Sequence, residues 1–146
     1  MIALIQRVTQ ASVSVNDVVI GQIGVGLLAL IGVQRNDEAE HAKRLLGKIL
    51  DYRVFPDETQ RMNRSLRDTG GGGLLLVPQF TLAADTAKGT RASFTRAAPP
   101  EHAMRLFDDL VDLARLTHSI IATGRFGANM QVSLINDGPV TFWLEV

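Results

Sequence analysis

The chain has 146 residues, no cysteine, and 15 Lys and Arg that balance 15 Asp and Glu. This length predicts a single domain, residues 1–146, whose hydrophobic core is large enough to fold without cross-links, and the missing cysteines exclude disulfides and thiolate catalysis. A formal net charge of zero argues against capture of nucleic acids or membranes by overall charge, although it leaves local basic patches open.

The first part of the chain has the pattern of strands. Its start lacks the basic region of a signal peptide, and no apolar run approaches the roughly 18 residues of a membrane span, so we expect a cytoplasmic protein. Ile2 to Val8 is short, apolar and β-branched, as suits a strand. Ala11 to Val15 and Val18 to Ile23 flank the turn-forming pair Asn16-Asp17, which predicts a hairpin. Leu27 to Ile31 is continuously apolar, a pattern typical of a strand covered on both faces.

Two helices are predicted, one after this strand and one in the last third of the chain. Asn36 and Asp37 are good N-cap residues, and Glu40 stands three residues after Asp37, as a capping box requires. The buried face expected for the first helix is Ala42, Leu45, Leu46, Ile49 and Leu50. Pro100 suits the first turn of the second helix. The apolar stripe expected there is Met104, Phe107, Leu110, Val111 and Ala114.

Further strands are expected between and after the helices. Tyr52 to Phe55 predicts a short strand ended by Pro56-Asp57, and Leu74 to Val77 predicts a buried one. Residues 83–98 predict a long polar loop, of a length that is usually functional or disordered. The closing strands are expected at Ser119 to Ala122, Asn129 to Ile135 and Val140 to Val146, the last two flanking a turn at Asn136 to Pro139. About seven or eight strands and two main helices thus predict an α/β fold, with mixed β-sheets covered by helices on one side.

Several familiar sites are excluded by their local context. Gly24-x-Gly26 opens a strand and not a helix, so it is no dinucleotide fingerprint. The run from Gly70 to Gly73 lacks the Lys and Ser or Thr of a phosphate-binding loop. No Gly-x-Ser-x-Gly elbow is present.

Two segments remain unusual. At Val77 to Leu82 a buried strand runs into Pro78, and proline is confined to the edges, ends or bulges of sheets. The chain is therefore expected to leave the sheet there, with the amides of Gln79, Phe80 and Thr81 free to point at a ligand. The second segment is Asn136 to Thr141. Taken alone, both segments also fit ordinary turn chemistry.

Together the two segments resemble the signature motifs of the D-aminoacyl-tRNA deacylases, which are Ser-Gln-Phe-Thr-Leu and Asn-x-Gly-Pro-Val-Thr. The likeness covers the whole chain, since residues 1–8, 82–86 and 140–144 also resemble the bacterial form of the family. One position departs from the family pattern: Pro78 stands where the first motif usually has Ser.

The resemblance implies a homodimer of three-layer β/β/α fold that acts on the acceptor end of aminoacyl-tRNA. We expect no cofactor, and the absent cysteines and scattered histidines favour an activity without metal. The implied reaction is hydrolysis of the ester between a D-amino acid and the terminal ribose of tRNA, with clearance of glycine as well. Gly138-Pro139 resembles a cis element that reaches from one subunit into the other's pocket, where its carbonyls exclude the side chain of an L-amino acid. The substrate-binding residues implied are Gly138, Pro139, Pro78, Arg7 and Asn136, with Arg7 bracing the turn.

The catalytic residues expected are Gln79, Phe80 and Thr81, and the amides around Phe80 and Thr81 are the candidates for an oxyanion hole. Thr81 is either a nucleophile or a pocket residue. No His or Lys near it in the sequence would activate its hydroxyl, and in the family the tRNA's own 2′-hydroxyl is argued to carry the chemistry. Phe80 either forms a wall for the terminal adenine or lies in the core, and Arg7 is otherwise a surface strand residue.

Two other functions stay open. An inactive module of the same fold would bind the tRNA end without hydrolysis, and Pro78 is the reason to consider it. A metal-dependent esterase is the second, weakened by the wide spacing of His41, His102 and His118 along the chain. Contacts to RNA phosphates are expected from some of Arg53, Arg61, Arg64, Arg67, Arg91 and Arg96.

Overall fold

A computed structural model describes all residues, 1–146. The strands are β1 (Ile2–Val15), β2 (Val18–Ile23), β3 (Gly26–Gly32), β4 (Phe55–Pro56), β5 (Met62–Arg64), β6 (Gly73–Pro78), β7 (Ile121–Thr123) and β8 (Gln131–Glu145). The helices are α1 (Ala39–Asp51) and α2 (Pro100–Thr117), and two 3-10 turns are η1 (Arg67–Thr69) and η2 (Phe80–Ala83). Neither α-helix is both long enough and apolar enough to span a membrane.

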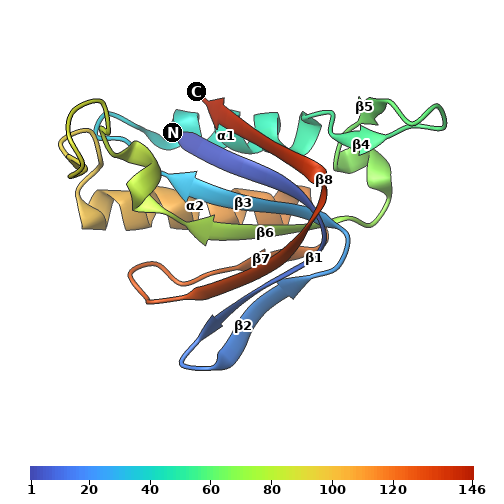
Figure 1. Ribbon diagram of the computed structural model, residues 1–146, viewed down its shortest axis with the longest axis horizontal. Coiled ribbons are helices and arrows are strands. Elements are labelled where there is room, and N and C mark those ends of the chain that lie inside the picture. The colour runs from blue at the N-terminus through green and yellow to red at the C-terminus, as the bar shows by residue number, and fades with distance from the viewer.

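Six strands form one curled, mixed sheet. Its order is β2-β1-β3-β6-β7, and β8 pairs with β1 in addition. The pairs β3–β6 and β6–β7 are parallel, and the others are antiparallel. Figure 1 shows both helices on one side of this sheet, with the small β4–β5 hairpin projecting at one end.

The centre of the sheet is buried on both faces, as its continuous apolar strands predict. Leu27, Ala29 and Ile31 of β3 pack into the larger core under the helices. Leu28 of the same strand packs with Leu75 and Val77 into a second core, under the bent halves of β1, β2 and β8. The predicted α/β fold with helices on one side and a three-layer β/β/α arrangement is confirmed.

The predicted turn at Asn136 to Pro139 is wrong, because the chain does not reverse there. Both halves of β8 pair with the same strand, β1. Asn136 pairs with Val8 and Thr141 pairs with Gln6, so Arg7 alone faces the four residues 137–140. The turn-forming sequence therefore makes a wide bulge in one long strand. The break expected between residues 8 and 11 is likewise only a shift in register, and β1 is continuous.

The predicted cap of the first helix is also wrong. Helix α1 begins after Glu38, whose amide donates to His41 Nδ1 at 3.0 Å. Asp37 is buried instead, at 5% exposure. Its Oδ1 accepts from the Met1 ammonium at 2.6 Å, and its Oδ2 accepts from the Gln34 amide at 2.6 Å. Asp37 thus holds the N-terminus against the segment that leads into α1.

Smaller differences follow from packing that is not visible locally. Met104 is 45% exposed, and Ala103 and Leu106 complete the buried stripe of α2 in its place. The strand predicted at Tyr52 to Phe55 begins only at Phe55, and its partner β5 escapes prediction because its three residues are all exposed. The strand predicted at Ser119 to Ala122 lies at Ile121–Thr123.

The turn between β4 and β5 is organised by the Asp57 carboxylate. It accepts hydrogen bonds from the Thr59 hydroxyl and amide, the Asn63 side chain and the Arg61 amide. These donors, the Thr59 hydroxyl foremost and then the Asn63 amide, lower the pKa of Asp57 from 3.8 to about 2. Because the folded pKa is depressed, the order that this carboxylate gives the turn is complete above about pH 4 and is lost toward pH 2.

Candidate active site

The first predicted segment leaves the sheet at the end of β6 and enters η2. The Gln79 amide donates to the Ile31 carbonyl at 2.7 Å, so the prediction that this amide is free for a ligand is wrong. The first hydrogen bond of η2 is donated by the Leu82 amide to the Gln79 carbonyl, at 3.3 Å. The amides of Phe80 and Thr81 precede that bond and have no partner within the turn. Two of the three expected donors are therefore available.

The side chains of this segment face outward. Gln79 Nε2 donates to the Thr81 hydroxyl at 2.6 Å, and no histidine or lysine hydrogen bonds to that hydroxyl. The Phe80 side chain is 57% exposed, which rules out the core alternative for this residue. Its ring lies against the ring of Phe94, with 5.2 Å between the centroids. An exposed aromatic pair thus borders the two available amides.

An apolar hollow of about 480 Å³ opens beside η2. Pro78, Gln79 and Phe80 form one wall. The opposite walls come from the start of α2 and from residues 126–132, including Phe126 and Met130. Sequence reasoning missed residues 126–132, because they carry no motif. They reach the site only through the packing of β7 and β8. The site therefore combines a polar turn with an apolar wall that a planar group would fit.

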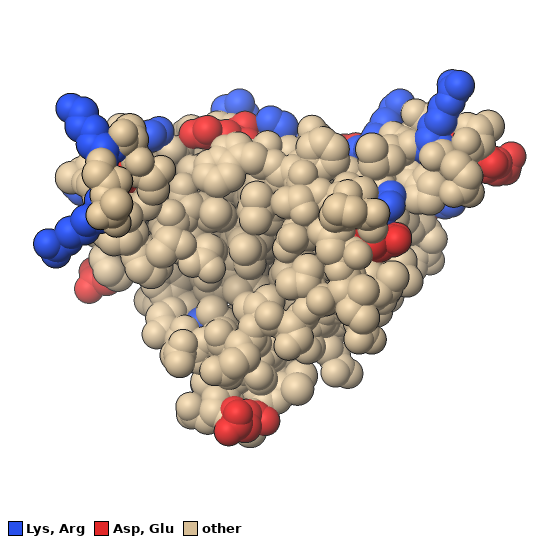
Figure 2. Space-filling model, in the orientation of Figure 1, with Lys and Arg blue, Asp and Glu red and all other residues tan.

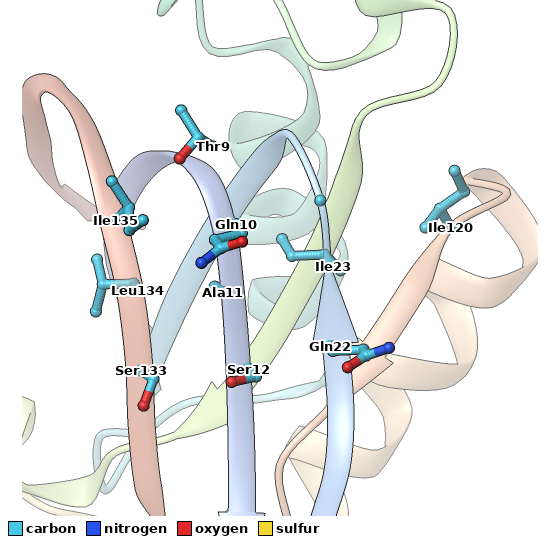
Figure 3. A pocket seen from close by; sticks show the side chains of 11 residues that line it. Thr9, Gln10, Ala11, Ser12, Gln22, Ile23, Ile120, Ser133, Leu134 and Ile135 are labelled. Carbon is cyan, nitrogen blue, oxygen red and sulfur yellow. The ribbon is translucent and has the colours of Figure 1, made fainter.

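A larger hollow of about 640 Å³ lies elsewhere, on the outer face of β1, β2 and β8 (Figure 3). The side chains drawn there include Gln10, Ser12, Gln22 and Ser133. None of its lining residues is titratable. It contains no acid, base or charged group, and none of the predicted site residues lies in it.

The second predicted segment is the bulge of β8, which is held rigidly from within. Arg7 Nε donates to the Asp137 carbonyl at 2.9 Å and lies 3.2 Å from its carboxylate, while the guanidinium also donates to the Val54 carbonyl. Asn136 Oδ1 accepts from the Val140 amide at 2.7 Å. The contact of Arg7 with this segment matches the bracing expected of it. The side-chain groups of Asn136 are all used inside the bulge.

The tip of the bulge is Gly138-Pro139, and both residues are exposed. The peptide bond between them is cis, as the resemblance implies. Gly138 has a φ of +154°, a region that side chains disfavour. The main chain of the tip is thus presented outward.

The structure does not bring the two segments together within one chain. Pro78 pairs with Ile31, and Ile31 pairs with Ala3. Asn136, however, pairs with Val8. Five residues along β1 and three strand spacings therefore separate the segments, which amounts to roughly 20 Å. In Figure 1, β6 ends toward the left, and β8 bends at the right near β4.

The match to a known family decides what class of protein this is. The family described as D-Tyr-tRNA(Tyr) deacylase matches residues 4–145. The chain belongs to the D-aminoacyl-tRNA deacylase family. The D-aminoacyl-tRNA deacylase of Alkalilimnicola ehrlichii is 66% identical over 145 residues, which cover 99% of this chain and 96% of that relative.

Two solved structures share the fold of this member of the D-aminoacyl-tRNA deacylase family. The structure named c-Myc DNA Unwinding Element Binding Protein superposes with a TM-score of 0.95 at 39% identity, covering 100% of this chain and 99% of that one. A probable eukaryotic D-amino acid tRNA deacylase superposes with a TM-score of 0.84 at 17% identity, covering 99% and 98%. The second likeness supports the fold alone.

Proposed function

We propose that this protein hydrolyses the ester joining a D-amino acid to the terminal ribose of tRNA, releasing the free amino acid and tRNA in the cytoplasm. The observation that carries the proposal is the pair of unpartnered amides at Phe80 and Thr81, beside an apolar hollow, in a chain of this family. Exposed aromatic rings stack on nucleobases, so the Phe80 ring suits the terminal adenine. The ester carbonyl then lies over the amides that follow.

The chemistry rests on charge stabilisation. Water attacks the ester carbonyl, and the oxygen that gains negative charge is held by the Phe80 and Thr81 amides. Each such donor contributes about 2.7–4 kcal/mol to the transition state. The intermediate then collapses with the 3′-oxygen of the ribose as leaving group, and the neighbouring 2′-hydroxyl of the tRNA is placed to assist proton transfer. Thr81 positions Gln79 in this scheme and does not attack.

The active unit in this proposal is a homodimer, in which the bulge of one subunit enters the pocket of the other. The separation of roughly 20 Å within one chain supports it, because segments this far apart in one chain can share a pocket only if they come from two subunits. Ile135 and Trp143 flank the bulge and are 53% and 51% exposed, which suits coverage by a second copy. Figure 2 shows few charged side chains over this face of the molecule.

Selection for the D-form follows from that arrangement. The carbonyls of Gly138 and Pro139 would occupy the space that the side chain of an L-amino acid needs. Main-chain atoms reject a handedness without regard to the kind of side chain, so one pocket serves many D-amino acids. Glycine has no side chain to reject, and we expect glycyl-tRNA to be hydrolysed as well.

The rival function is an inactive module that binds the tRNA end. Pro78 favours it, since proline offers neither the hydroxyl of the family's serine nor an amide proton. The two available amides lie beyond Pro78, however, and the chain enters η2 with them unpartnered. Incubation with D-aminoacyl-tRNA in the presence of a chelator separates the candidates. The deacylase hydrolyses it under these conditions, the binding module never does, and a metal-dependent esterase stops.

Mixing two inactive variants tests the shared site. Phe80→Pro removes the ring and one amide proton, and Gly138→Ala disturbs the bulge. In a mixed dimer, one of the two pockets keeps an intact η2 from one subunit and an intact bulge from the other. Co-refolding equal amounts should restore about a quarter of wild-type activity, because half of the dimers are mixed and each has one intact site. If verified mixed dimers show no recovery, the site is not shared. The variant Phe80→Ala removes the ring but keeps the amide proton, so its activity distinguishes the role of the ring from that of the amide.

Thr81→Val should keep most of the wild-type rate. Its hydroxyl accepts from Gln79 and has no base to activate it, so the loss should be limited to the positioning of that side chain. Single-turnover hydrolysis of D-aminoacyl-tRNA measures this, with Thr81→Ser as the control that retains the hydroxyl. A loss near 10⁴-fold that Thr81→Ser does not show would make the hydroxyl a reacting group.

A further inference from the structure

A third hollow, of about 430 Å³, lies where the end of β3 meets the start of α1. Arg35 and Arg96 lie on its two sides, and the Arg35 amide donates to the Arg96 carbonyl at 2.9 Å. Thr95 joins them, since its carbonyl accepts from Arg35 Nε at 3.0 Å. The remaining lining residues are Gln34, Asn36, Asp37, His41 and Val146. Main-chain pairing therefore holds the two arginines beside one polar cavity, and the Thr95 carbonyl also positions the Arg35 guanidinium.

The charge of this hollow is positive. Both arginine side chains are exposed, and neither forms an ion pair with a carboxylate. Asp37 is the one acidic side chain in the lining, and the Met1 ammonium and the Gln34 amide already occupy its oxygens. The main-chain oxygen of Val146, the last residue, also accepts from the Met1 ammonium, at 3.1 Å. Glu38 and Glu40 lie on the neighbouring turn of α1 but do not line the cavity. An anion would thus meet two unpaired guanidinium groups.

His41 adds a ring nitrogen to the hollow. Its Nδ1 accepts a hydrogen bond from the Glu38 amide at 3.0 Å, so Nε2 is the nitrogen that remains to donate. His41 lines the hollow together with the arginines. The donors in the lining are therefore two guanidinium groups and an imidazole nitrogen.

Residues 94–98 connect this hollow to the proposed active site along the chain. The Phe94 ring lies against Phe80, at the start of this segment. Thr95 and Arg96 follow directly and line the basic hollow. Ala98, at the end of the segment, lines the apolar hollow beside η2. In Figures 1 and 2, the loop after η2 lies at the upper left, where basic side chains project.

We propose that this hollow binds the backbone phosphates of the acceptor strand just before the nucleotide that carries the ester. The proposal rests on the proposed function, which places the terminal adenine at Phe80. An RNA strand that ends there must pass the adjoining segment, and planar guanidinium groups bind phosphate with two parallel hydrogen bonds. A neutral protein would thereby grip a polyanion at one end through a local pair of arginines.

The double variant Arg35→Ala/Arg96→Ala tests the subsite. With D-aminoacyl-tRNA we expect KM to rise roughly 10- to 100-fold while kcat stays unchanged, because the lost contacts are charge-assisted and remote from the ester. The slope of log KM against log salt should become shallower by about 1 to 1.5. With a D-aminoacyl ester of adenosine, which carries no phosphate, both kinetic constants should equal those of the wild type.

Controls separate the subsite from overall charge and from the proposed function. Lys43→Ala/Arg115→Ala removes the same charge from exposed basic residues outside the hollow, and an equal rise in KM there contradicts the subsite. Arg35→Lys/Arg96→Lys keeps the charge and should recover part of the loss. The Kd for tRNA that carries no amino acid, measured at several salt concentrations, tests the subsite without hydrolysis. An unchanged Kd and slope in the double variant overturns it, whereas a wild type that binds normally but hydrolyses neither ester overturns only the proposed function.

Discussion

Gly138→Ala is expected to lower kcat/KM for D-aminoacyl-tRNA by about 100-fold or more, while the fold persists. A Cβ at this position would lie 2.5 Å from the Val140 nitrogen and 2.6 Å from its Cγ2. The Val140 nitrogen cannot easily move away, because it donates to Asn136 Oδ1 at 2.7 Å. The φ of +154° adds to the cost of the new side chain. The tip of the bulge must therefore shift, and a displacement of about 1 Å suffices for a loss of this size.

The same variant separates local from global damage. Gly138 is exposed and lies outside both cores, so the local strain should lower Tm only moderately and leave the fold intact. Gly70→Ala is the matched control: Gly70 also has a positive φ, +72°, but nothing lies within 4 Å of its Cβ position. It should cost some stability and no activity. Hydrolysis of D- and L-aminoacyl-tRNA by both variants is the measurement, and a Gly138→Ala protein with full rate and full D-selectivity contradicts the role of the bulge.

Asp37→Asn is expected to have the largest effect on stability, a loss of about 3–5 kcal/mol, as when one partner of a buried ion pair is removed. Met1 is fully buried and Asp37 is 5% exposed, so the ammonium would lose its counter-charge away from water. Both partners of the carboxylate, the Met1 ammonium and the Gln34 amide, are donors. The NH₂ group of asparagine would therefore face a donor at one of the two positions.

Thermal unfolding measures this loss. At about 2–4 °C per kcal/mol for a chain near this size, Tm should fall by roughly 10 °C. The matched control is Asp51→Asn, since Asp51 pairs with Arg67 at the same kind of distance, 2.7 Å, but both side chains are largely exposed. Exposed pairs contribute about 0–1 kcal/mol, and Tm should barely change. Equal Tm shifts in the two variants would show that burial of the Met1–Asp37 pair carries no special weight.

Local patterns predict the centre of the fold well. The continuous apolar runs at Leu27 to Ile31 and Leu74 to Val77 indicate strands buried on both faces, and the two cores on either side of β3 and β6 confirm this. The failures have a common cause. Asn136 to Pro139 has the chemistry of a turn, yet the pairing of both flanks with β1, more than a hundred residues away, makes it a bulge. Asp37 is a typical N-cap residue, yet its carboxylate binds the Met1 ammonium, which is distant in the sequence.

The candidate site divides in the same way. The two motifs identify the segments that matter, but motif spacing along the chain says nothing about their distance in space. The Gln79 amide was expected to be free, and only the pairing of β6 with β3 shows that Ile31 occupies it. Phe126 and Met130 reach the apolar hollow by tertiary packing and carry no signal of their own. Burial and partner choice are nonlocal, and these are the properties that sequence reasoning missed.

The length of β1 between Ala3 and Val8 sets the distance between η2 and the bulge, and this length can change only by whole residues. One added residue would turn every later side chain of the strand to the opposite face and exchange core for solvent. Two added residues would keep the faces but move the bulge by about 6.6 Å relative to η2. Groups that act on a substrate must stay within about 0.5 Å of their working geometry. Insertions in this stretch of β1 therefore cannot adjust the site in small steps. Small adjustments of its geometry must come from substitutions in η2 and in the bulge.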